Sequence, residues 1–241
     1  MYEMFNVIPF TGCGADGKLK LHQAATMMID SCQFQELQEV EFKKFLNDNH
    51  LAIFLYSIQL DILRMPQFNE YVRTAVKIYG AKSIYGLRRI TMHDESGKLC
   101  LIANATGAFF DLQAQKAIKF DPSIFPLKLD EAEEMECLPR KITIPPGSGT
   151  EAEKFTVRPS ALDPNGHLTS AEYLAAASDV LPENCQFNRV RVEYKKQAKP
   201  GEVITPVIHH LPETDKYVID LKSSDGLSFA VTEFSRFTPG C

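Results

Sequence analysis

The segment Asn165-Gly166-His167-Leu168 leads directly into a helical pattern over residues 171–180. A counterpart, Asp16-Gly17-Lys18-Leu19, leads into a longer helical pattern over residues 21–39. In both patterns the apolar residues recur at the spacing that places them on one face of an α-helix. The same turn-then-helix signal therefore occurs twice, which indicates an internal repeat.

Each predicted helix is followed by segments that have the alternating or apolar character of β-strands. In the first half these segments are residues 51–63, 71–79, 84–93 and 99–112, and in the second half they are 187–196, 203–210, 216–221 and 227–237. Residues 94–98 and 223–226 are hairpin signals between the last two strands of each half. A helix followed by antiparallel strands, repeated, predicts an α+β fold rather than alternating β-α-β units.

The composition excludes several classes of protein. A hydrophobic fraction of 44%, with 16 Phe and 8 Tyr, is enough for a substantial core. A formal net charge of −5 without a long basic run argues against nucleic acid as a partner. The most apolar stretch, residues 99–110, is too short and interrupted to span a bilayer, so we expect no membrane span.

The cysteines and the first residues predict a cytoplasmic protein with reduced thiols. The chain begins without a basic segment followed by an apolar one, so no secretory signal is expected. The six cysteines form no C-x-x-C pair: they are Cys13, Cys32, Cys100, Cys137, Cys185 and Cys241. Adjacent His209 and His210 would point to opposite faces of a strand, so we expect no metal site there. We expect no cofactor.

An acidic run at residues 130–136, followed by prolines and glycines at 144–149, is typical of a connection between domains. We therefore predict an N-terminal unit over residues 1–128, a linker over 129–149 and a C-terminal unit over 150–241.

The C-terminal copy of the turn carries a set of polar residues suited to catalysis. Asp163, Asn165 and His167 occupy alternate positions, and Thr169 or Ser170 can cap the following helix. A proton acceptor, an amide donor and a helix N-terminus together suit the attack of water on a carbonyl group. The alternative is structural, because Asp-Pro-Asn-Gly is also a strong turn sequence.

Four segments carry a resemblance to a known family. Residues 51–54 and the following strand, the turn Gly86-Leu87-Arg88-Arg89, the signature Asp163-Pro164-Asn165-Gly166-His167 and the strand residues 192–196 occur in the family's order. In these features the chain resembles the bacterial and plant acyl-acyl carrier protein (acyl-ACP) thioesterases over nearly its whole length.

The resemblance implies a double hot-dog fold, in which each of two tandem units is a long helix wrapped by an antiparallel sheet. It implies hydrolysis of the thioester between a fatty acyl chain and the phosphopantetheine arm of acyl carrier protein. The acyl pocket is expected in the N-terminal unit and the catalytic groups in the C-terminal unit, and a homodimer is one possible assembly. Asn165 or backbone N–H groups would bind the thioester oxygen or water, His167 would transfer protons, and Asp163 would orient the imidazole or organise the loop.

The chain departs from the family at one place. The family strand commonly ends in a Glu-Cys pair, and the aligned residues here are Gln197 and Ala198. A cysteine nucleophile is therefore absent at this position, and Gln197 can hold a water but cannot accept its proton. If this alignment is wrong, Glu193 and Glu172 are the first carboxylates to consider.

Further residues are candidates for substrate binding, each with a structural alternative. Apolar side chains on the first helix would form either core or acyl pocket, and basic clusters would be either solvated faces or docking sites for the acidic carrier protein. These candidates are Met27, Met28, Phe34, Arg88, Arg89, Lys195 and Lys196, with Lys199 beside them.

Three hypotheses for the function stay open at this point. The first is an acyl-ACP thioesterase, the second an acyl-CoA thioesterase on the same fold, and the third a non-catalytic acyl-binding protein. Gln197 and Ala198 favour the third hypothesis, whereas Asp163, Asn165 and His167 oppose it.

Overall fold

The structure is a computed structural model that describes residues 1–147 and 149–238. The chain forms two compact units. The N-terminal unit comprises Met1–Ile58 and Ile62–Cys137, and the C-terminal unit comprises Gln59–Asp61 and the residues from Leu138 onward. Ser148 of the predicted linker and Cys241 lie outside the described residues.

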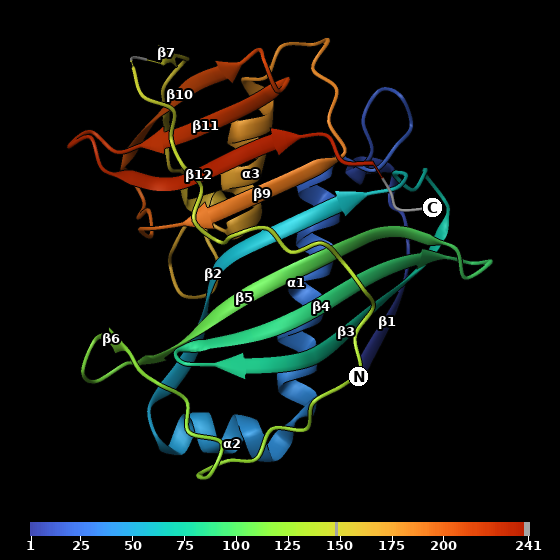
Figure 1. The fold of residues 1–241 in the computed structure, drawn as a ribbon, viewed down its shortest axis with the longest axis vertical. Helices are drawn as coiled ribbons and strands as arrows, with labels where there is room; N and C mark the ends of the chain where they lie inside the picture. The colour runs from blue at the N-terminus through green and yellow to red at the C-terminus, as the bar shows by residue number, and fades with distance from the viewer. Residues whose placement is uncertain (148, 239–241) are drawn as a thin grey trace. The chain divides into compact units, whose positions relative to one another are not determined.

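The N-terminal unit is an antiparallel sheet with helices on one side. Its elements in chain order are β1 (Tyr2–Val7), the 3-10 helix η1 (Phe10–Gly12), α1 (Leu21–Gln38), α2 (Val40–Asp48), β2 (Leu51–Ile62), β3 (Tyr71–Lys82), β4 (Tyr85–Asp94), β5 (Leu99–Asp111) and β6 (Lys116–Ala117). Its main strands lie in the order β1-β3-β4-β5-β2. Helix α1 packs against β3 and β4, as Figure 1 shows.

Helix α1 buries one continuous face. Its buried residues recur at steps of three or four, which is the repeat of an α-helix. They are Leu21, Ala24, Ala25, Met28, Ser31, Cys32, Gln35 and Glu36. The prediction of one helix over 21–39 is right for α1, but α2 was not predicted. Its buried Phe42 and Leu46, four residues apart, are the signal that could have identified it.

The C-terminal unit has the same plan on a smaller scale. Its elements are β7 (Thr150–Glu151), β8 (Phe155–Thr156), η2 (Pro159–Ala161), α3 (Ser170–Asp179), β9 (Arg189–Tyr194), β10 (Val203–Leu211), β11 (Lys216–Lys222) and β12 (Ser228–Ser235). The strands lie in the order β9-β12-β11-β10-β7, and α3 packs against β11 and β12. With ten residues, α3 is shorter than the long helix that the resemblance implied.

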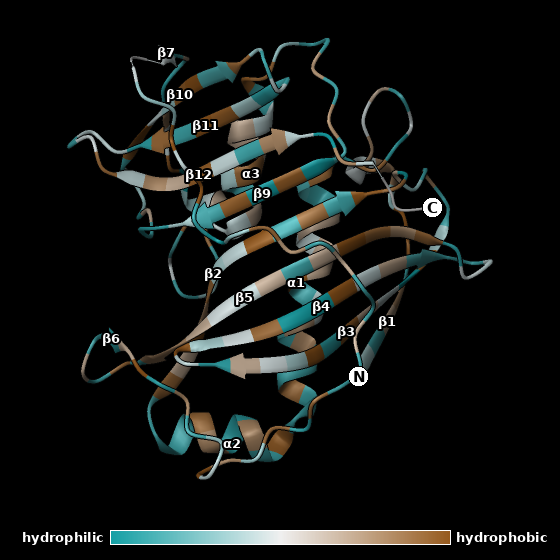
Figure 2. Cartoon of the chain, viewed as in Figure 1, coloured by the Kyte–Doolittle hydropathy of each residue, from teal (hydrophilic) through white to brown (hydrophobic). Residues whose placement is uncertain are grey.

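The strands carry hydrophobic and hydrophilic residues interspersed along their length (Figure 2). In the N-terminal unit, Phe42, Leu46 and Phe109 form a buried cluster, and Phe109 stacks on Phe120 with ring centroids 4.5 Å apart. In the C-terminal unit, Ile142, Val218 and Val231 form a second cluster. Each unit therefore has its own hydrophobic core, as a domain requires.

The residues of the predicted linker are held against the two units. Asp130 N–H donates to Ile78 O at 2.7 Å, and Lys77 forms an ion pair with Glu133 at 2.8 Å. In the C-terminal unit, the Glu193 carboxylate accepts the N–H of Ile142 at 2.9 Å.

Within the C-terminal unit, the residues Gln59–Asp61 of β2 make buried polar contacts. Arg189 donates to both carboxylate oxygens of Asp61, at 2.7 and 2.6 Å, and Gln59 Oε1 accepts the N–H of Leu138 at 2.9 Å. A bidentate contact of this kind has fixed geometry, so it fixes Asp61 against Arg189 of β9.

The α+β double hot-dog prediction is confirmed: each unit consists of a helix packed against an antiparallel sheet. Within the described chain, no helix combines the length and the apolar character needed to cross a membrane.

Candidate active site

The turns before α1 and α3 have the same backbone hydrogen bonds. In the first, Gly14 N–H donates to Lys18 O at 2.8 Å and Gly17 N–H to Gly14 O at 3.0 Å. In the second, Asp163 N–H donates to His167 O at 2.7 Å and Gly166 N–H to Asp163 O at 2.9 Å.

The two turns also share their conformation, because Gly17 and Gly166 have φ of +75° and +78°, in the left-handed region that glycine adopts without strain. His167 therefore occupies the position of Lys18. The duplicated turn has an imidazole in the C-terminal copy alone.

Asp163 organises this turn. Its Oδ1 accepts the backbone N–H groups of Asn165 at 2.9 Å and His167 at 3.0 Å, and Asn165 Nδ2 lies 3.5 Å from its Oδ2. Of the two roles predicted for Asp163, this geometry supports the organisation of the loop. The aspartate fixes the backbone that presents Asn165 and His167.

The side chains of Asn165 and His167 differ in exposure. Asn165 is exposed, whereas His167 is half-buried. Within the described chain, the buried Nδ1 of His167 has no hydrogen-bond partner. A buried polar atom without a partner is costly, so this nitrogen is suited to bind water or a substrate group.

Helix α3 begins directly after the turn. Thr169 Oγ1 accepts the N–H of Glu172 at 3.3 Å, which caps the helix. The remaining N–H groups of the first turn give this end a partial positive charge. The predicted capping residue is therefore Thr169 rather than Ser170, which is the first residue of α3.

Tyr173 of α3 holds the segment that follows β9. Its hydroxyl accepts the N–H of Ala198 at 2.8 Å and donates to Lys196 O at 3.5 Å, while Leu168 N–H donates to Ala198 O at 3.0 Å. Burial raises the pKa of Tyr173 to about 12, so its hydroxyl stays protonated at neutral pH. These bonds place the segment carrying Gln197 beside the turn carrying His167.

Gln197 and Ala198 have different surroundings. Gln197 is exposed, whereas Ala198, which the sequence analysis aligned with the family cysteine, is fully buried. Of the alternative carboxylates, Glu193 is buried and accepts hydrogen bonds from Ile142 N–H and from Arg140 Nη1 at 3.3 Å. Glu172 is exposed in the first turn of α3. Glu193 therefore has a structural role. Of the two carboxylates considered in place of Gln197, Glu172 is the one left as a candidate.

The predicted basic residues fall into an exposed group and a buried group. Lys195, Lys196 and Lys199 are exposed in the segment that contains Gln197, and the amine of Lys196 lies 3.8 Å from Glu202. By contrast, the side chain of Arg88 is 14% exposed and pairs with Glu36 at 3.8 Å, and Arg89 is 4% exposed. Because Arg89 is buried, its guanidinium cannot contact a carrier protein, so Arg89 does not contribute to a docking surface.

An apolar cavity of about 50 Å³ lies in the N-terminal unit. Helix α1 contributes Ile29, Cys32 and Gln33, and the other lining residues are Phe42, Ile53, Leu55, Ile78, Gly86, Leu87, Arg88, Ala105, Gly107, Phe109 and Leu127. Of the predicted α1 residues, Met28 is fully buried and Phe34 is exposed, and Met27 lies between these extremes. The cavity lining does not include these three predicted residues. It includes Ile29, next to Met28, and Gln33, next to Phe34.

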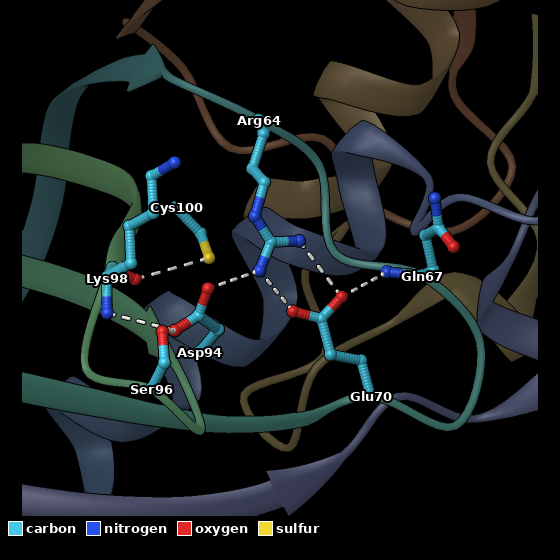
Figure 3. A network of polar contacts seen from close by, with 7 residues as sticks. All are labelled: Arg64, Gln67, Glu70, Asp94, Ser96, Lys98 and Cys100. Atoms are coloured by element: carbon cyan, nitrogen blue, oxygen red, sulfur yellow. Dashed lines mark hydrogen bonds and ion pairs between the residues drawn. The ribbon is translucent and has the colours of Figure 1, made fainter.

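A network of polar side chains joins the connection between β2 and β3 to the β4–β5 hairpin in the N-terminal unit (Figure 3). Arg64 binds the Glu70 carboxylate, with one contact of 3.0 Å, and binds Asp94 at 2.7 Å. Ligand atoms of Glu70, Asp94 and Cys100 lie within 4.8 Å of one another, a spacing compatible with a metal ion. Because the Arg64 guanidinium already binds both carboxylates, we interpret this network as structural.

The network shifts the ionisation of both acids. Hydrogen bonds from Ser96 and then from Arg64 hold the pKa of Asp94 well below its ordinary value. The hydrogen bonds from Arg64 likewise lower the pKa of Glu70. Both carboxylates are therefore charged at neutral pH.

Comparison with known proteins identifies matches over nearly the whole chain. The profile of the acyl-ACP thioesterase N-terminal domain matches residues 1–126, and that of the C-terminal domain matches residues 147–232. No curated protein matches the sequence.

Two solved structures are similar over at least 96% of both chains. An acyl-ACP thioesterase from Bacteroides thetaiotaomicron has a TM-score of 0.86 and 18% identity, covering 97% of this chain and 96% of its own. The 12:0-ACP thioesterase from Umbellularia californica has a TM-score of 0.77 and 12% identity, with the same coverage of 97% and 96%. At these identities the similarity establishes the fold.

Proposed function

Because this chain belongs to the acyl-ACP thioesterase family and is therefore a thioester hydrolase, we propose that it hydrolyses fatty acyl-ACP through the turn at residues 163–167. The observation that carries this proposal is the set of hydrogen bonds that joins this turn, the start of α3 and the segment 195–199. The bonds of Ala198 to Leu168 and Tyr173 hold two backbone segments together. One segment carries Asn165 and His167, and the other carries Gln197.

The reaction is direct attack of water on the thioester carbonyl. His167 accepts a proton from the water as it attacks, and then donates that proton to the sulfur of the departing phosphopantetheine thiolate. Asn165 Nδ2 and the free N–H groups at the start of α3 are suited to bind the oxyanion that forms. Each such donor is worth about 3 kcal/mol in acyl transfer.

Gln197 positions water in this mechanism. Its amide can hold a water molecule by hydrogen bonds, but it cannot accept a proton. The imidazole of His167 is therefore the proton acceptor, because Asp163 already accepts two backbone N–H groups in the turn.

The exposed lysines beside this turn support docking of acyl carrier protein. Lys195 and Lys199 are exposed positive charges in a protein of net charge −5, whereas Lys196 already pairs with Glu202 and Asp225. Such charges attract an acidic carrier protein over roughly one Debye length, about 8 Å at physiological ionic strength.

The apolar cavity of the N-terminal unit is the proposed binding site for the acyl chain. Its walls are mostly aliphatic and aromatic side chains from α1, α2 and the sheet, which suits a hydrocarbon ligand. Three further points stay predictions. They are a homodimer, a cytoplasmic location, and substrate binding by Met27, Met28 and Phe34.

A comparison of two thioester donors tests the proposed function. The purified protein is supplied with the same acyl chain on acyl carrier protein and on coenzyme A, and released fatty acid is quantified by mass spectrometry. The proposal predicts a higher kcat/KM for the carrier protein donor. Equal or higher kcat/KM for coenzyme A would indicate an acyl-CoA thioesterase, and no release from either would indicate a non-catalytic acyl-binding protein.

A further inference from the structure

Two neighbouring cavities of the N-terminal unit share part of their lining. The apolar cavity of about 50 Å³ described above is lined in part by Phe42, Ile78 and Leu127. The same three side chains line a second cavity of about 300 Å³, which lies between the start of α2 and residues 125–128. These three residues therefore stand between the two cavities, and we call them the cavity wall.

The apolar cavity is small for the acyl chain that the proposed function assigns to it. Sites for small molecules typically have volumes of about 300–1,000 Å³, and a cavity of about 150 Å³ holds one benzene molecule. A volume of about 50 Å³ is roughly one third of that benzene-binding volume, so it accommodates only a few carbon atoms. A longer chain has room only if it passes the cavity wall into the second cavity.

Phe42 has the largest side chain in the cavity wall. It is 4% exposed and belongs to the buried cluster with Leu46 and Phe109. Its ring also packs on that of Phe125, with ring centroids 5.2 Å apart. Because side chains in a close-packed interior have little free space, the ring of Phe42 obstructs the passage between the cavities.

Backbone hydrogen bonds hold the rest of the wall in place. Asp130 N–H donates to Ile78 O at 2.7 Å, and Ile78 N–H donates to the Asp130 carboxylate at 3.3 Å. At the other end of the same segment, Phe120 N–H donates to Ser83 O at 3.1 Å. The residues between these bonds, which include Leu127, pass alongside α2 (Figure 1). The segment that carries Leu127 is thus attached to the sheet at both ends.

We propose that Phe42 determines the acyl-chain specificity of this protein, because its ring confines the acyl chain to the smaller cavity. This inference rests on the proposed function, since it concerns the acyl chain of that reaction. With Phe42 in place, methylene groups beyond those that the smaller cavity holds meet a closed wall, and kcat/KM falls as the chain lengthens. Without the ring the two cavities join, and a longer chain gains apolar contacts with Val40, Phe125 and Pro126.

The chain-length profile of Phe42→Ala tests this proposal. The kcat/KM is measured for hexanoyl-, octanoyl-, lauroyl- and palmitoyl-ACP with the wild type and the variant. The wild type should prefer hexanoyl-ACP, and the ratio of kcat/KM for lauroyl-ACP to that for hexanoyl-ACP should rise at least about tenfold in Phe42→Ala. One methylene group in a hydrophobic pocket already changes kcat/KM by about 10–200-fold, so a shift of this size is readily measured.

Two further variants separate the cavity wall from general packing. Leu127→Ala opens the same wall at a half-buried position, so it should shift the ratio in the same direction and decides the test if Phe42→Ala does not fold. Phe45→Ala is the matched control. Phe45 lies on the same helix and packs against the same cluster, with its ring centroid 6.4 Å from that of Phe42, but it lines neither of these two cavities. Phe45→Ala should leave the ratio unchanged.

Three results would overturn the proposal. They are an unchanged ratio in the folded wall variants, an equal shift in Phe45→Ala, and a wild type that prefers palmitoyl-ACP.

Binding of free fatty acids distinguishes this inference from the proposed function. The Kd values of hexanoate and laurate are measured by isothermal titration calorimetry with the wild type and Phe42→Ala, and the affinity for laurate relative to hexanoate should rise about tenfold in the variant. If no acyl-ACP is hydrolysed but the relative affinity shifts, the proposed function is wrong and the cavity wall still selects chain length. Hydrolysis with unchanged ratios of kcat/KM and Kd would overturn this inference alone, and neither hydrolysis nor binding would overturn both.

Discussion

Replacement of Tyr173 by Phe tests whether the contact between α3 and the segment 195–199 supports catalysis. The ring is buried and its hydroxyl accepts the N–H of Ala198 at 2.8 Å, with Ala198 fully buried. Phe fills the same volume apart from the oxygen, so the main loss is a buried N–H left without an acceptor. That loss costs about 1–3 kcal/mol. The free energy of unfolding should fall by this amount.

The same change should lower turnover. Without the hydroxyl, Ala198 keeps only the bond from Leu168 N–H to its carbonyl, so the segment carrying Gln197 is held less firmly beside His167. We expect kcat on acyl-ACP to fall more than KM changes.

Urea unfolding followed by circular dichroism and a fatty acid release assay provide the two measurements. Tyr217→Phe is the matched control, because Tyr217 stacks on His210 of β10, with ring centroids 4.3 Å apart, and is remote in sequence from the turn. It should change the free energy of unfolding by less than about 0.5 kcal/mol. A Tyr173→Phe variant with the stability and kcat of the wild type would refute the reasoning, and lost stability with normal kcat would refute its catalytic part.

Three further predictions concern pH, docking and the unusual Gln197. The pKa values of Asp94 and Glu70 are lowered from ordinary values of 3.8 and 4.5, so their contribution to stability is present above these values and is lost as the pH falls below them. The difference in Tm between wild type and Arg64→Gln should thus narrow below pH 4.5, and a constant difference between pH 7 and pH 3 would contradict this. Exchanging Lys195 and Lys199 for Glu should lower kcat/KM for acyl-ACP about tenfold at low salt. The kcat/KM for a short thioester without the carrier protein should not change. Equal losses of kcat/KM on both substrates would indicate damage to the fold. Gln197→Glu should raise kcat or leave it unchanged and extend activity to lower pH, because the carboxylate adds a proton acceptor near the turn; a folded but inactive variant would show that Gln197 has another role.

The elements of the fold could be predicted from local patterns. The predicted strand over 99–112 corresponds to β5 at Leu99–Asp111, and the predicted helix over 171–180 corresponds to α3 at Ser170–Asp179. These elements have strong periodicity and are bounded by turn residues. The strands β6, β7 and β8 were missed, because two residues carry too little periodicity to be distinguished from loops. The six-residue strand β1 was also missed.

The surroundings of individual side chains could not be predicted in the same way. Arg88 and Arg89 read as a basic cluster in the sequence, but a strand directs neighbouring side chains to opposite faces, and both faces of β4 are covered. Arg88 meets Glu36 of α1, and Arg89 lies beneath the segment that ends at Cys137. Such burial depends on partners 48 or more residues away in the chain, which local patterns do not reveal.

The turn at 163–167 lies between these two cases. Its residue types indicated both a turn and a catalytic site, and the structure shows that Asp163 forms the turn that presents His167. What the sequence did not indicate is the contribution of Tyr173, because its hydrogen bond to Ala198 joins residues 25 positions apart.

The kcat of His167→Ala on acyl-ACP tests the central claim most directly. His210→Ala is the matched control, because His210 is an exposed histidine of the same unit on β10. We predict a fall in kcat of about 10²–10⁴-fold for His167→Ala, the usual contribution of a general acid–base group, with little change in KM and none in His210→Ala. A folded His167→Ala variant with near-normal kcat would contradict the proposed mechanism.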